Sequence, residues 1–390
     1  MPAFTGQLNS NEIFAAIYNL IISQEIFASN IKGTHSELVD AARVDGSLYG
    51  DQKLFYGTDV LKSRDWLNDA EASNLLAINR PAAPRVQAIV LDVFRQIDIT
   101  VDYYLSKRAW GTEGAFSQFT SVILGWLRET KRVYDSTTYN AYIGTADSQA
   151  AKGKVEVDLT TALNGLSGLE KSKAEALYVA QSLADLFVEL KDISRDFNDY
   201  GFLRSYADGD LKVVWSAKWV NKIRKVDLPT IFHKDGLMEF EHVLPARYFG
   251  TVITSSNASS FEYNATTNPS GPLTISSGTA TVSTAAGRNL VRTLVEADFT
   301  VGATTTHLFA GDALPNGATF TVASVSGLYV EDPNIICRVE HNRSVPFMSA
   351  FETGTSFFNP RSLTENHYLT WGHNTIEYLK NYPFIKVVAK

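Results

Sequence analysis

The spacing of apolar residues changes several times along the chain, and each change marks a different kind of element. Residues 11–29 carry apolar side chains at helical spacing, which predicts an amphipathic helix that Asn9 or Ser10 could cap. Residues 30–84 then show little periodicity and several glycine and proline breakers. An apolar helix followed by a long segment without a closed core predicts an extended arm that packs on other subunits. The apolar positions of the helix are Ile13, Ile17, Leu20 and Ile21.

Residues 86–105 alternate between apolar and polar side chains and therefore predict a strand with one wet face. The alternation is clearest in IDITVDYY. One face takes Ile97, Ile99, Val101 and Tyr103, and the other takes Asp98, Thr100 and Asp102.

Two long helices and a short strand are predicted next. The first helix carries one wide apolar stripe and ends in the polar run YDSTTYNAYIGT. The strand is KVEVDLT, over 154–160, and the second helix covers about 168–194, where Ser167 and Glu170 form a capping-box pattern. The stripe of the first helix is Phe116, Phe119, Ile123, Trp126 and Val133; that of the second is Leu169, Leu177, Ala180, Leu183, Phe187 and Leu190.

The stretch DLKVVWSAKWVNKIRK, residues 210–225, interleaves basic and aromatic residues and could be read as a nucleic-acid grip. The pattern favours another interpretation. FLRSY and LKVVW are short apolar runs joined by ADGD, which suits a hairpin turn, and Ser216 can cap a short helix. On that helix the apolar side takes Trp219, Val220 and Ile223, and the wet side takes Lys218, Lys222 and Lys225.

Composition shifts sharply at residues 251–330, which contain 25 Ser or Thr residues. Short alternating runs such as TATVST are separated by Gly, Pro and Asn, and this pattern predicts an inserted all-β module rather than a disordered segment. The module has few charges, and after it the chain returns to strands and ends on FIKVV, a segment expected to be tied into a sheet. The six charged residues are Glu262, Arg288, Arg292, Glu296, Asp298 and Asp312.

The overall composition is that of a soluble globular protein, with 390 residues, 45% hydrophobic residues and 20% charged residues. The net charge of -7 argues against a chain whose main task is to grip phosphate. The single cysteine, Cys337, excludes an intramolecular disulfide and is expected to be buried in a strand. The apolar run at 11–29 is too short and too broken for a membrane span, and it lacks a signal-peptide pattern, so folding in a cytoplasm is expected.

No catalytic constellation is evident, and no catalytic, cofactor-binding or metal-binding residue is assigned. The sequence contains no Gly-rich phosphate loop, dinucleotide fingerprint or nucleophile elbow. His367 and His373 would share a strand face, which makes a metal site conceivable, but exposed histidines on a sheet are the commoner outcome. Glu239 and Glu241 are interpreted as solvated, and the Asp208-Gly209-Asp210 segment as a turn rather than a calcium loop. We therefore expect a protein that is not an enzyme.

The order of these elements resembles the major capsid protein of tailed double-stranded DNA bacteriophages, whose fold is called the Johnson fold or Hong Kong 97 capsid fold. QAIVLDVFRQIDITVDYYLSKRAW resembles the return strand of the extended loop. GAFSQFTSVILGWLRETKRVYDSTTYNAYIG resembles the long spine helix, with its following acidic residue, Asp135, and glycine, Gly144. SYADGDLKVVWSAKWVNKIRK resembles a strand and helix of the axial domain, and the last twenty residues resemble closing peripheral strands. GDALPNGATFTVASVSGLY is similar to a stretch of the inserted domains in some coat proteins.

The resemblance implies an α+β fold in which the segments have distinct places. These are an N-terminal arm (1–49), an extended loop with strands (50–107), a peripheral domain with the spine helix (108–200), an axial-domain segment (201–250), an inserted β-rich domain (251–330) and returning strands (331–390).

The same resemblance implies a structural function. Copies would form pentamers and hexamers that close into an icosahedral head around double-stranded DNA, in a virion assembled in the bacterial cytoplasm. The implied partners are other copies, a scaffolding protein, a portal, a possible decoration protein and non-specifically contacted DNA, without a membrane or a cofactor. The alternative is a virion-attached or secreted oligomeric adhesin, in which residues 251–330 bind carbohydrate.

Overall fold

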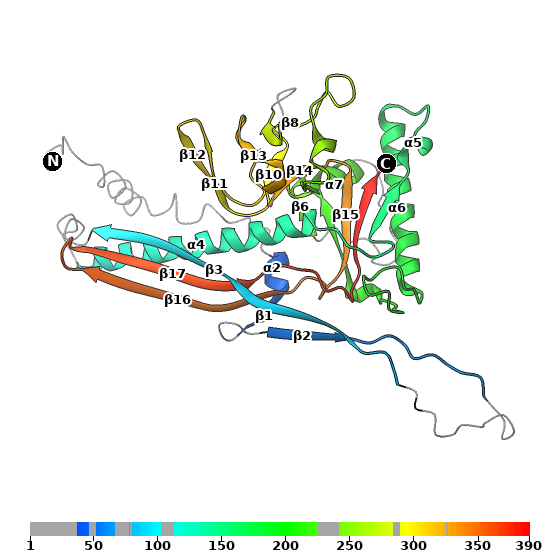
Figure 1. The fold of residues 1–390 in the computed structure, drawn as a ribbon, viewed down its shortest axis with the longest axis horizontal. Coiled ribbons are helices and arrows are strands. Elements are labelled where there is room, and N and C mark those ends of the chain that lie inside the picture. The colour runs from blue at the N-terminus through cyan, green and yellow to red at the C-terminus, as the bar shows by residue number, and fades with distance from the viewer. Residues whose placement is uncertain are drawn as a thin grey trace.

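The computed structural model describes residues 37–46, 52–66, 78, 80–102, 113–224, 242–283, 289–324 and 327–390. The helix expected at 11–29 lies outside these residues, as do Lys225, Glu239 and Glu241. Within the described part of the chain, two five-stranded sheets and one long helix form the frame, and a smaller β module packs beside them (Figure 1). The short elements at the start are α2 (Glu37–Ala41) and β1 (Arg43–Asp45).

The long sheet has the strand order β1-β16-β17-β3-β2. Its centre is an antiparallel ribbon in which β17 pairs with β16 on one side and with β3 on the other. Figure 1 shows the helix α4 running along this ribbon. Leu127 and Tyr134 of the helix pack against Leu369 and Trp371 of β17. The strands are β2 (Gln52–Gly57), β3 (Arg85–Asp102), β16 (Phe347–Asn359) and β17 (Thr364–Asn374); the helix is α4 (Glu113–Thr145).

The expected alternation on the strand at 86–105 is confirmed for its described part. Ile97 and Ile99 are half-buried toward α4, while Asp98 and Thr100 are exposed. One face of β3 therefore packs on the helix and the other meets solvent, as a period of two requires.

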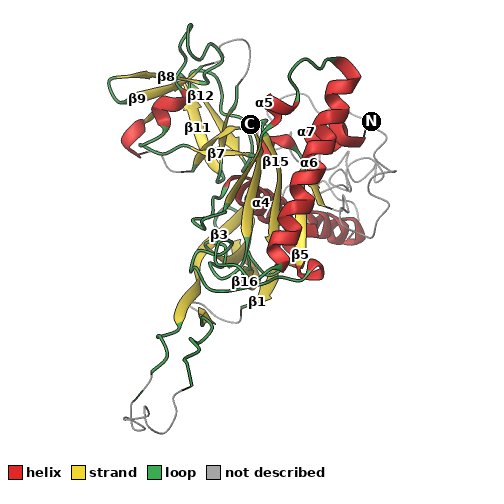
Figure 2. Ribbon diagram, turned by 90° about the vertical axis from the view of Figure 1, so that its right-hand side faces the viewer, coloured by secondary structure: helices red, strands yellow, loops and turns green. Residues whose placement is uncertain are grey.

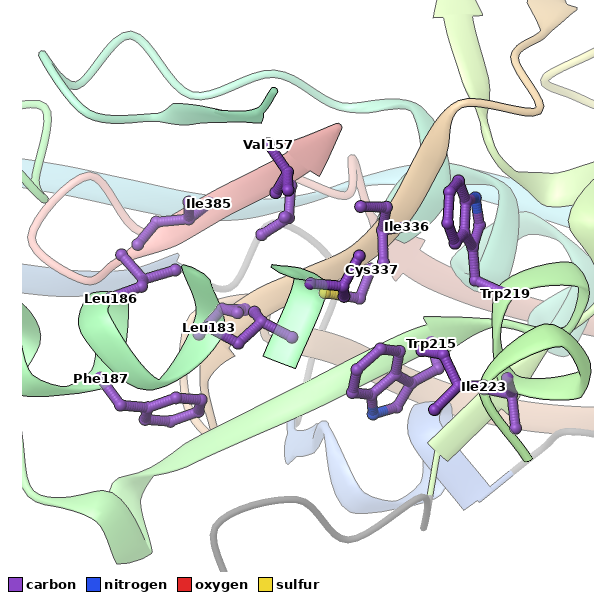
Figure 3. Packing of buried hydrophobic residues seen from close by; sticks show 14 of the residues in the cluster. Val157, Leu183, Leu186, Phe187, Trp215, Trp219, Ile223, Ile336, Cys337 and Ile385 are labelled. Carbon is purple, nitrogen blue, oxygen red and sulfur yellow. The ribbon is translucent and has the colours of Figure 1, made fainter. Parts of the chain in front are cut away.

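The second sheet has the order β4-β18-β15-β5-β6, and its two faces are both covered. One face packs on α6 and α7 around Trp215 and Leu183, as Figure 3 shows. The other face packs on the C-terminal part of α4 around Tyr139 and Phe384. The elements are β4 (Lys154–Val157), α5 (Leu159–Ala162), α6 (Gly168–Lys191), η1 (Asp208–Asp210), β5 (Leu211–Ser216), α7 (Ala217–Arg224), β6 (His242–Leu244), β15 (Ile335–His341) and β18 (Phe384–Ala389).

The β module has a hydrophobic core of its own, which contains Ile253, Leu273, Leu314 and Val330. It comprises the sheets β10-β14-β7 and β13-β9-β8 and the hairpin β11-β12. Figure 2 shows β8 and β9 at the end of the module farthest from the long sheet. Its elements are η3 (Ala246–Tyr248), β7 (Gly250–Val252), η4 (Ala258–Phe261), β8 (Leu273–Ser276), β9 (Thr279–Val282), β10 (Val291–Thr293), β11 (Ala297–Val301), β12 (Thr304–Leu308), β13 (Thr319–Thr321), η6 (Val322–Ser324) and β14 (Leu328–Glu331).

The first long helix ends in the polar run YDSTTYNAYIGT, as expected, but the exposure of its side chains differs from the pattern. This run forms the last three turns of α4 and is the most buried part of the helix among the described side chains. Asp135 and Asn140 are each 1% exposed. Trp126, placed on the apolar stripe from its spacing, is 53% exposed. Tertiary partners therefore override the polarity of the local sequence here.

Three smaller expectations are also wrong. FLRSY does not form a strand, because Arg204 makes only an isolated bridge with Ser194, and the turn at Asp208–Asp210 leads into β5 without a hairpin. Ser167 is the N-cap of α6 but makes no side-chain capping hydrogen bond. Leu169 and Leu177 are exposed, because the face of α6 that meets the sheet is rotated toward Ala176, Val179 and Leu186.

The division between a peripheral segment (108–200) and an axial segment (201–250) stays a prediction. Residues from both ranges, for example Leu183 and Trp215, pack in a single core. The other segment boundaries stay predictions as well.

Candidate assembly surfaces

The arm formed by β2, the extended segment 58–66 and the start of β3 projects away from the rest of the chain (Figures 1 and 2). It exposes large apolar side chains, and Trp66 is 89% exposed. Because a two-stranded ribbon has no second layer, no other described segment of the chain buries these side chains. The exposed apolar residues of the arm are Leu54, Tyr56, Val60, Leu61, Trp66, Ile78 and Val86.

The opposite end of the long sheet exposes a second set of apolar residues. β16 and β17 are joined at 360–363, and Phe357 is 72% exposed beside this turn. Phe358 and Leu363 are exposed as well. The outer edge of β16 pairs with β1 only at Phe347–Ser349, so most of that edge meets no other described strand. Exposed edges and apolar tips of this kind are typical of surfaces that other chains cover.

Between these two ends, α4 is fixed to the sheet by a polar network. The hydroxyl of Tyr134 lies 3.2 Å from Nε of Arg95 and 3.0 Å from Nε2 of His373. Asp135 pairs with Arg43 at 3.3 Å and with Lys131 at 3.7 Å. Burial raises the pKa of Asp135, although both cations act to lower it. Nearly buried charges cost free energy unless they are paired, so this network holds α4 in one register on the sheet.

A second group of buried charges lies under the C-terminal end of α4. Arg338 and Glu340 on β15 are 1% and 0% exposed. The guanidinium of Arg338 lies 4.1 Å from the ring centroid of Phe384 and donates to the carbonyl oxygen of Ala146 at 2.6 Å. Glu340 pairs with Lys212 at 3.0 Å. Burial lowers the pKa of Arg338, because desolvation penalises the charged guanidinium.

The interleaved stretch at 210–225 is a strand and a helix of the core, as expected. Trp215 lies one residue before the end of β5 and is completely buried, and Trp219 is 6% exposed on α7 (Figure 3). Nε1 of Trp219 donates to the carbonyl oxygen of Pro333 at 3.1 Å. Both indole rings are thus occupied by the core and are not presented as stacking platforms for bases.

One lysine of that helix does not behave as expected. Lys218 is exposed, but Lys222 pairs with Glu175 of α6, whose side chain is only 8% exposed. The ammonium of Lys222 also lies 4.6 Å from the ring centroid of Trp219. Lys222 is therefore only half-buried on the outer side of the helix, but it is not the freely solvated lysine that the pattern predicts. The helix pattern identified the apolar face correctly, but it could not show which flanking charge meets a partner on α6.

The other candidate site residues are not brought together. The expectation that His367 and His373 are exposed is wrong, because both are buried. His373 bonds to Tyr134 and His367 lies 4.0 Å from Glu365, so each histidine of β17 has a partner of its own. Among the described residues, no three His, Cys, Asp or Glu side chains gather as a metal site would need. Cys337 is fully buried in β15, as expected, and burial raises the pKa of its thiol. Within the same described residues, no helix is both long and apolar enough to span a bilayer.

The architecture just described defines a class. A long helix lies on a long antiparallel ribbon, an arm projects from one end of that ribbon, and a second sheet with flanking helices and an inserted β module completes the chain. This is the α+β fold of bacteriophage capsid proteins that the sequence led us to expect.

Comparison with solved structures supports this class. The capsid structure of Staphylococcus phage Andhra aligns with 100% of this chain and 89% of its own, at a TM-score of 0.54 and 9% identity. The structure of the head fiber and inner core protein gp22 of bacteriophage P68 aligns with 89% of this chain and 82% of its own, at a TM-score of 0.49 and 10% identity. The capsid structure of cyanophage P-SCSP1u aligns with 100% of this chain and 93% of its own, at a TM-score of 0.46 and 11% identity. At 9% identity, the first of these alignments shows a shared fold and no more.

Sequence comparison gives no match. No protein-family model matches the chain, and no curated protein matches it.

Proposed function

We propose that this chain is the major coat protein of a tailed-phage head. Copies would assemble into pentamers and hexamers, and these would close into an icosahedral shell around double-stranded DNA. The observation that supports this proposal most is the projecting arm, whose large apolar side chains are exposed. The chain has a fold that it shares with a phage capsid structure. A soluble chain gains by covering such a surface, and a closed shell of identical subunits covers it on every copy.

The proposed role is structural rather than catalytic. Near α4, Asp135 pairs with Arg43, Glu340 pairs with Lys212, and Arg338 donates to a backbone carbonyl, which suits a rigid frame. Scaffolding, portal and decoration proteins are the proposed partners, and the virion is the proposed location after assembly in a bacterial cytoplasm. The acidic net charge of -7 suits a lining that does not hold packed DNA tightly. A strongly basic inner surface in an assembled shell would contradict that last point.

Negative-stain electron microscopy of the full-length protein, purified after expression with and without a scaffolding protein, tests the proposal. We expect closed shells with discrete pentameric and hexameric capsomers. Trimeric spikes would refute the capsid role and support the adhesin alternative. Binding of the full-length chain to a glycan array would point the same way, because the proposed coat protein needs no carbohydrate ligand.

A further inference from the structure

The base of the projecting arm is held by contacts that the coat-protein role alone does not require. Asp59 lies two residues after the end of β2, in the extended segment 58–66. Its Oδ2 lies 2.6 Å from Nη1 of Arg195, and its Oδ1 accepts from the backbone N–H of Leu203 at 3.0 Å. One carboxylate thus bridges the arm to the loop 192–204, which follows α6. Charge-assisted hydrogen bonds are short and geometrically specific, so this contact restrains where the arm leaves the loop 192–204.

A second contact beside it joins the same two segments. Nη2 of Arg204 donates to the carbonyl oxygen of Thr58 at 2.5 Å. The same guanidinium holds Oδ1 of Asn381 at 3.2 Å, so it also ties in the loop before β18. Gly57 makes the close approach possible, since a Cβ there would lie 3.1 Å from the ring of Phe202. The segment after β2, the loop 192–204 and the loop before β18 therefore meet at the guanidinium of Arg204.

The loop that receives these contacts is itself fixed. Ser194 and Arg204 exchange backbone hydrogen bonds of 2.9 and 3.0 Å. The side chain of Asn198 bonds to both backbone groups of Phe202, at 2.7 and 2.8 Å. A rigid loop transmits force, whereas a loose one would let the arm swing with it.

The other strand of the arm is anchored separately. The side-chain amide of Gln87 on β3 donates to the carbonyl oxygen of Tyr378 at 3.0 Å and accepts from the N–H of Lys380 at 2.9 Å. The two strands are therefore held at different points, Asp59 beyond β2 and Gln87 within β3. Two separate points of attachment prevent a ribbon from rotating about either one.

From this geometry we propose that Asp59 is a positioning residue, which sets the direction of the arm relative to the sheet β4-β18-β15-β5-β6. The ion pair with Arg195 and the bond from Leu203 form what we call the arm clamp. This inference rests on the proposed function, because the direction of the arm decides which part of a neighbouring copy it meets. A clamped arm offers one geometry for contact with a neighbouring copy. A released arm offers many geometries, and an assembled shell would then curve irregularly.

The test is Asp59→Ala, with Asp65→Ala as the matched control. Asp65 is an exposed carboxylate on the same extended segment and makes none of the clamp contacts. Hydrogen exchange on unassembled chains reads the clamp directly, because the amide of Leu203 donates to Asp59. We expect the Leu203 amide to exchange about tenfold faster or more in Asp59→Ala, and unchanged in Asp65→Ala. The unfolding midpoint should change little, which separates positioning from a general loss of stability.

Electron microscopy of the assembled variants gives the second readout. We expect regular closed shells from wild type and Asp65→Ala, and mixed sizes, open sheets or tubes from Asp59→Ala. Arg195→Met should reproduce the Asp59→Ala result, because it removes the same ion pair from the other side. Unchanged exchange at Leu203 together with regular shells would overturn the clamp. A wild-type protein that forms no shell would instead contradict the coat-protein role, so the two failures are distinguishable.

Discussion

Replacing Lys222 with alanine separates the structural interpretation of the basic stretch from the one that its sequence pattern favours. By pattern, Lys218 and Lys222 are equivalent solvated lysines, and neither should matter for folding. In the structure, Lys222 pairs with Glu175 and covers Trp219, whereas Lys218 is exposed. The two single substitutions should therefore differ, although they lie on the same helix and remove the same charge.

The size of the effect follows from burial. The side chain of Glu175 is 8% exposed and that of Lys222 is 38% exposed. Breaking a fully buried pair by removing one partner costs about 3–5 kcal/mol, and an exposed pair is worth about 0.2–1 kcal/mol. The Lys222 end reaches solvent, which screens the pair, so we expect Lys222→Ala to cost about 1–3 kcal/mol. Lys218→Ala should stay within about 0.5 kcal/mol of wild type.

Urea unfolding of the full-length chain, followed by tryptophan fluorescence, measures both variants. Glu175→Gln in the Lys222→Ala background completes a double-mutant cycle. We expect the double variant to be less destabilised than the sum of the singles, because the second change removes the carboxylate that the first left uncompensated. The structural interpretation fails if Lys222→Ala and Lys218→Ala unfold at the same midpoint, or if the cycle shows no coupling.

Three further outcomes are expected. Trp219→Ala should lower the free energy of unfolding in urea by about 3–5 kcal/mol and abolish assembly, since it leaves a cavity in the core. A variant as stable as wild type would refute this packing of Trp219. Gly144→Ala should destabilise by about 1–3 kcal/mol, because a Cβ there overlaps the backbone of η3, whereas Gly125→Ala on the same helix, with open space around it, should stabilise slightly. The hydrogen bond to Asp298 raises the pKa of His307 in the folded protein. The protonated histidine therefore contributes its full stabilisation below pH about 6.5, the unfolded value, and this contribution is lost as the pH rises through the folded pKa. An NMR titration of unassembled chains should show that pKa falling in Asp298→Asn; an unchanged value would contradict the pairing.

Local patterns determined the type of most elements, for a simple physical reason. A period of two on β3 and a period near 3.6 on α6 and α7 arise from backbone geometry, so they can be read without knowing any partner. Trp219, Val220 and Ile223 were placed correctly on the buried side of α7 in this way. The order of the elements, compared with a known family, then gave the class of fold.

Tertiary structure decided where the polar residues of these elements go. The polar end of α4 is buried because Tyr139 and Ile143 pack in the core that covers the second sheet, and Arg43, far away in the chain, pairs with Asp135 there. Spacing alone could not find this, since periodicity records which face is apolar and not which charge will meet a counter-charge.

The arm clamp shows the same limit most clearly. The segment 58–66 has no periodic pattern, and Asp59 is one aspartate among many in the sequence. Only the fold brings it to Arg195 and to the amide of Leu203. The sequence by itself therefore determined the periodic elements and the fold class, because these depend on backbone geometry and on the burial of apolar faces. The paired charges and the direction of the arm depend on distances between segments remote in sequence, and only the tertiary structure sets those.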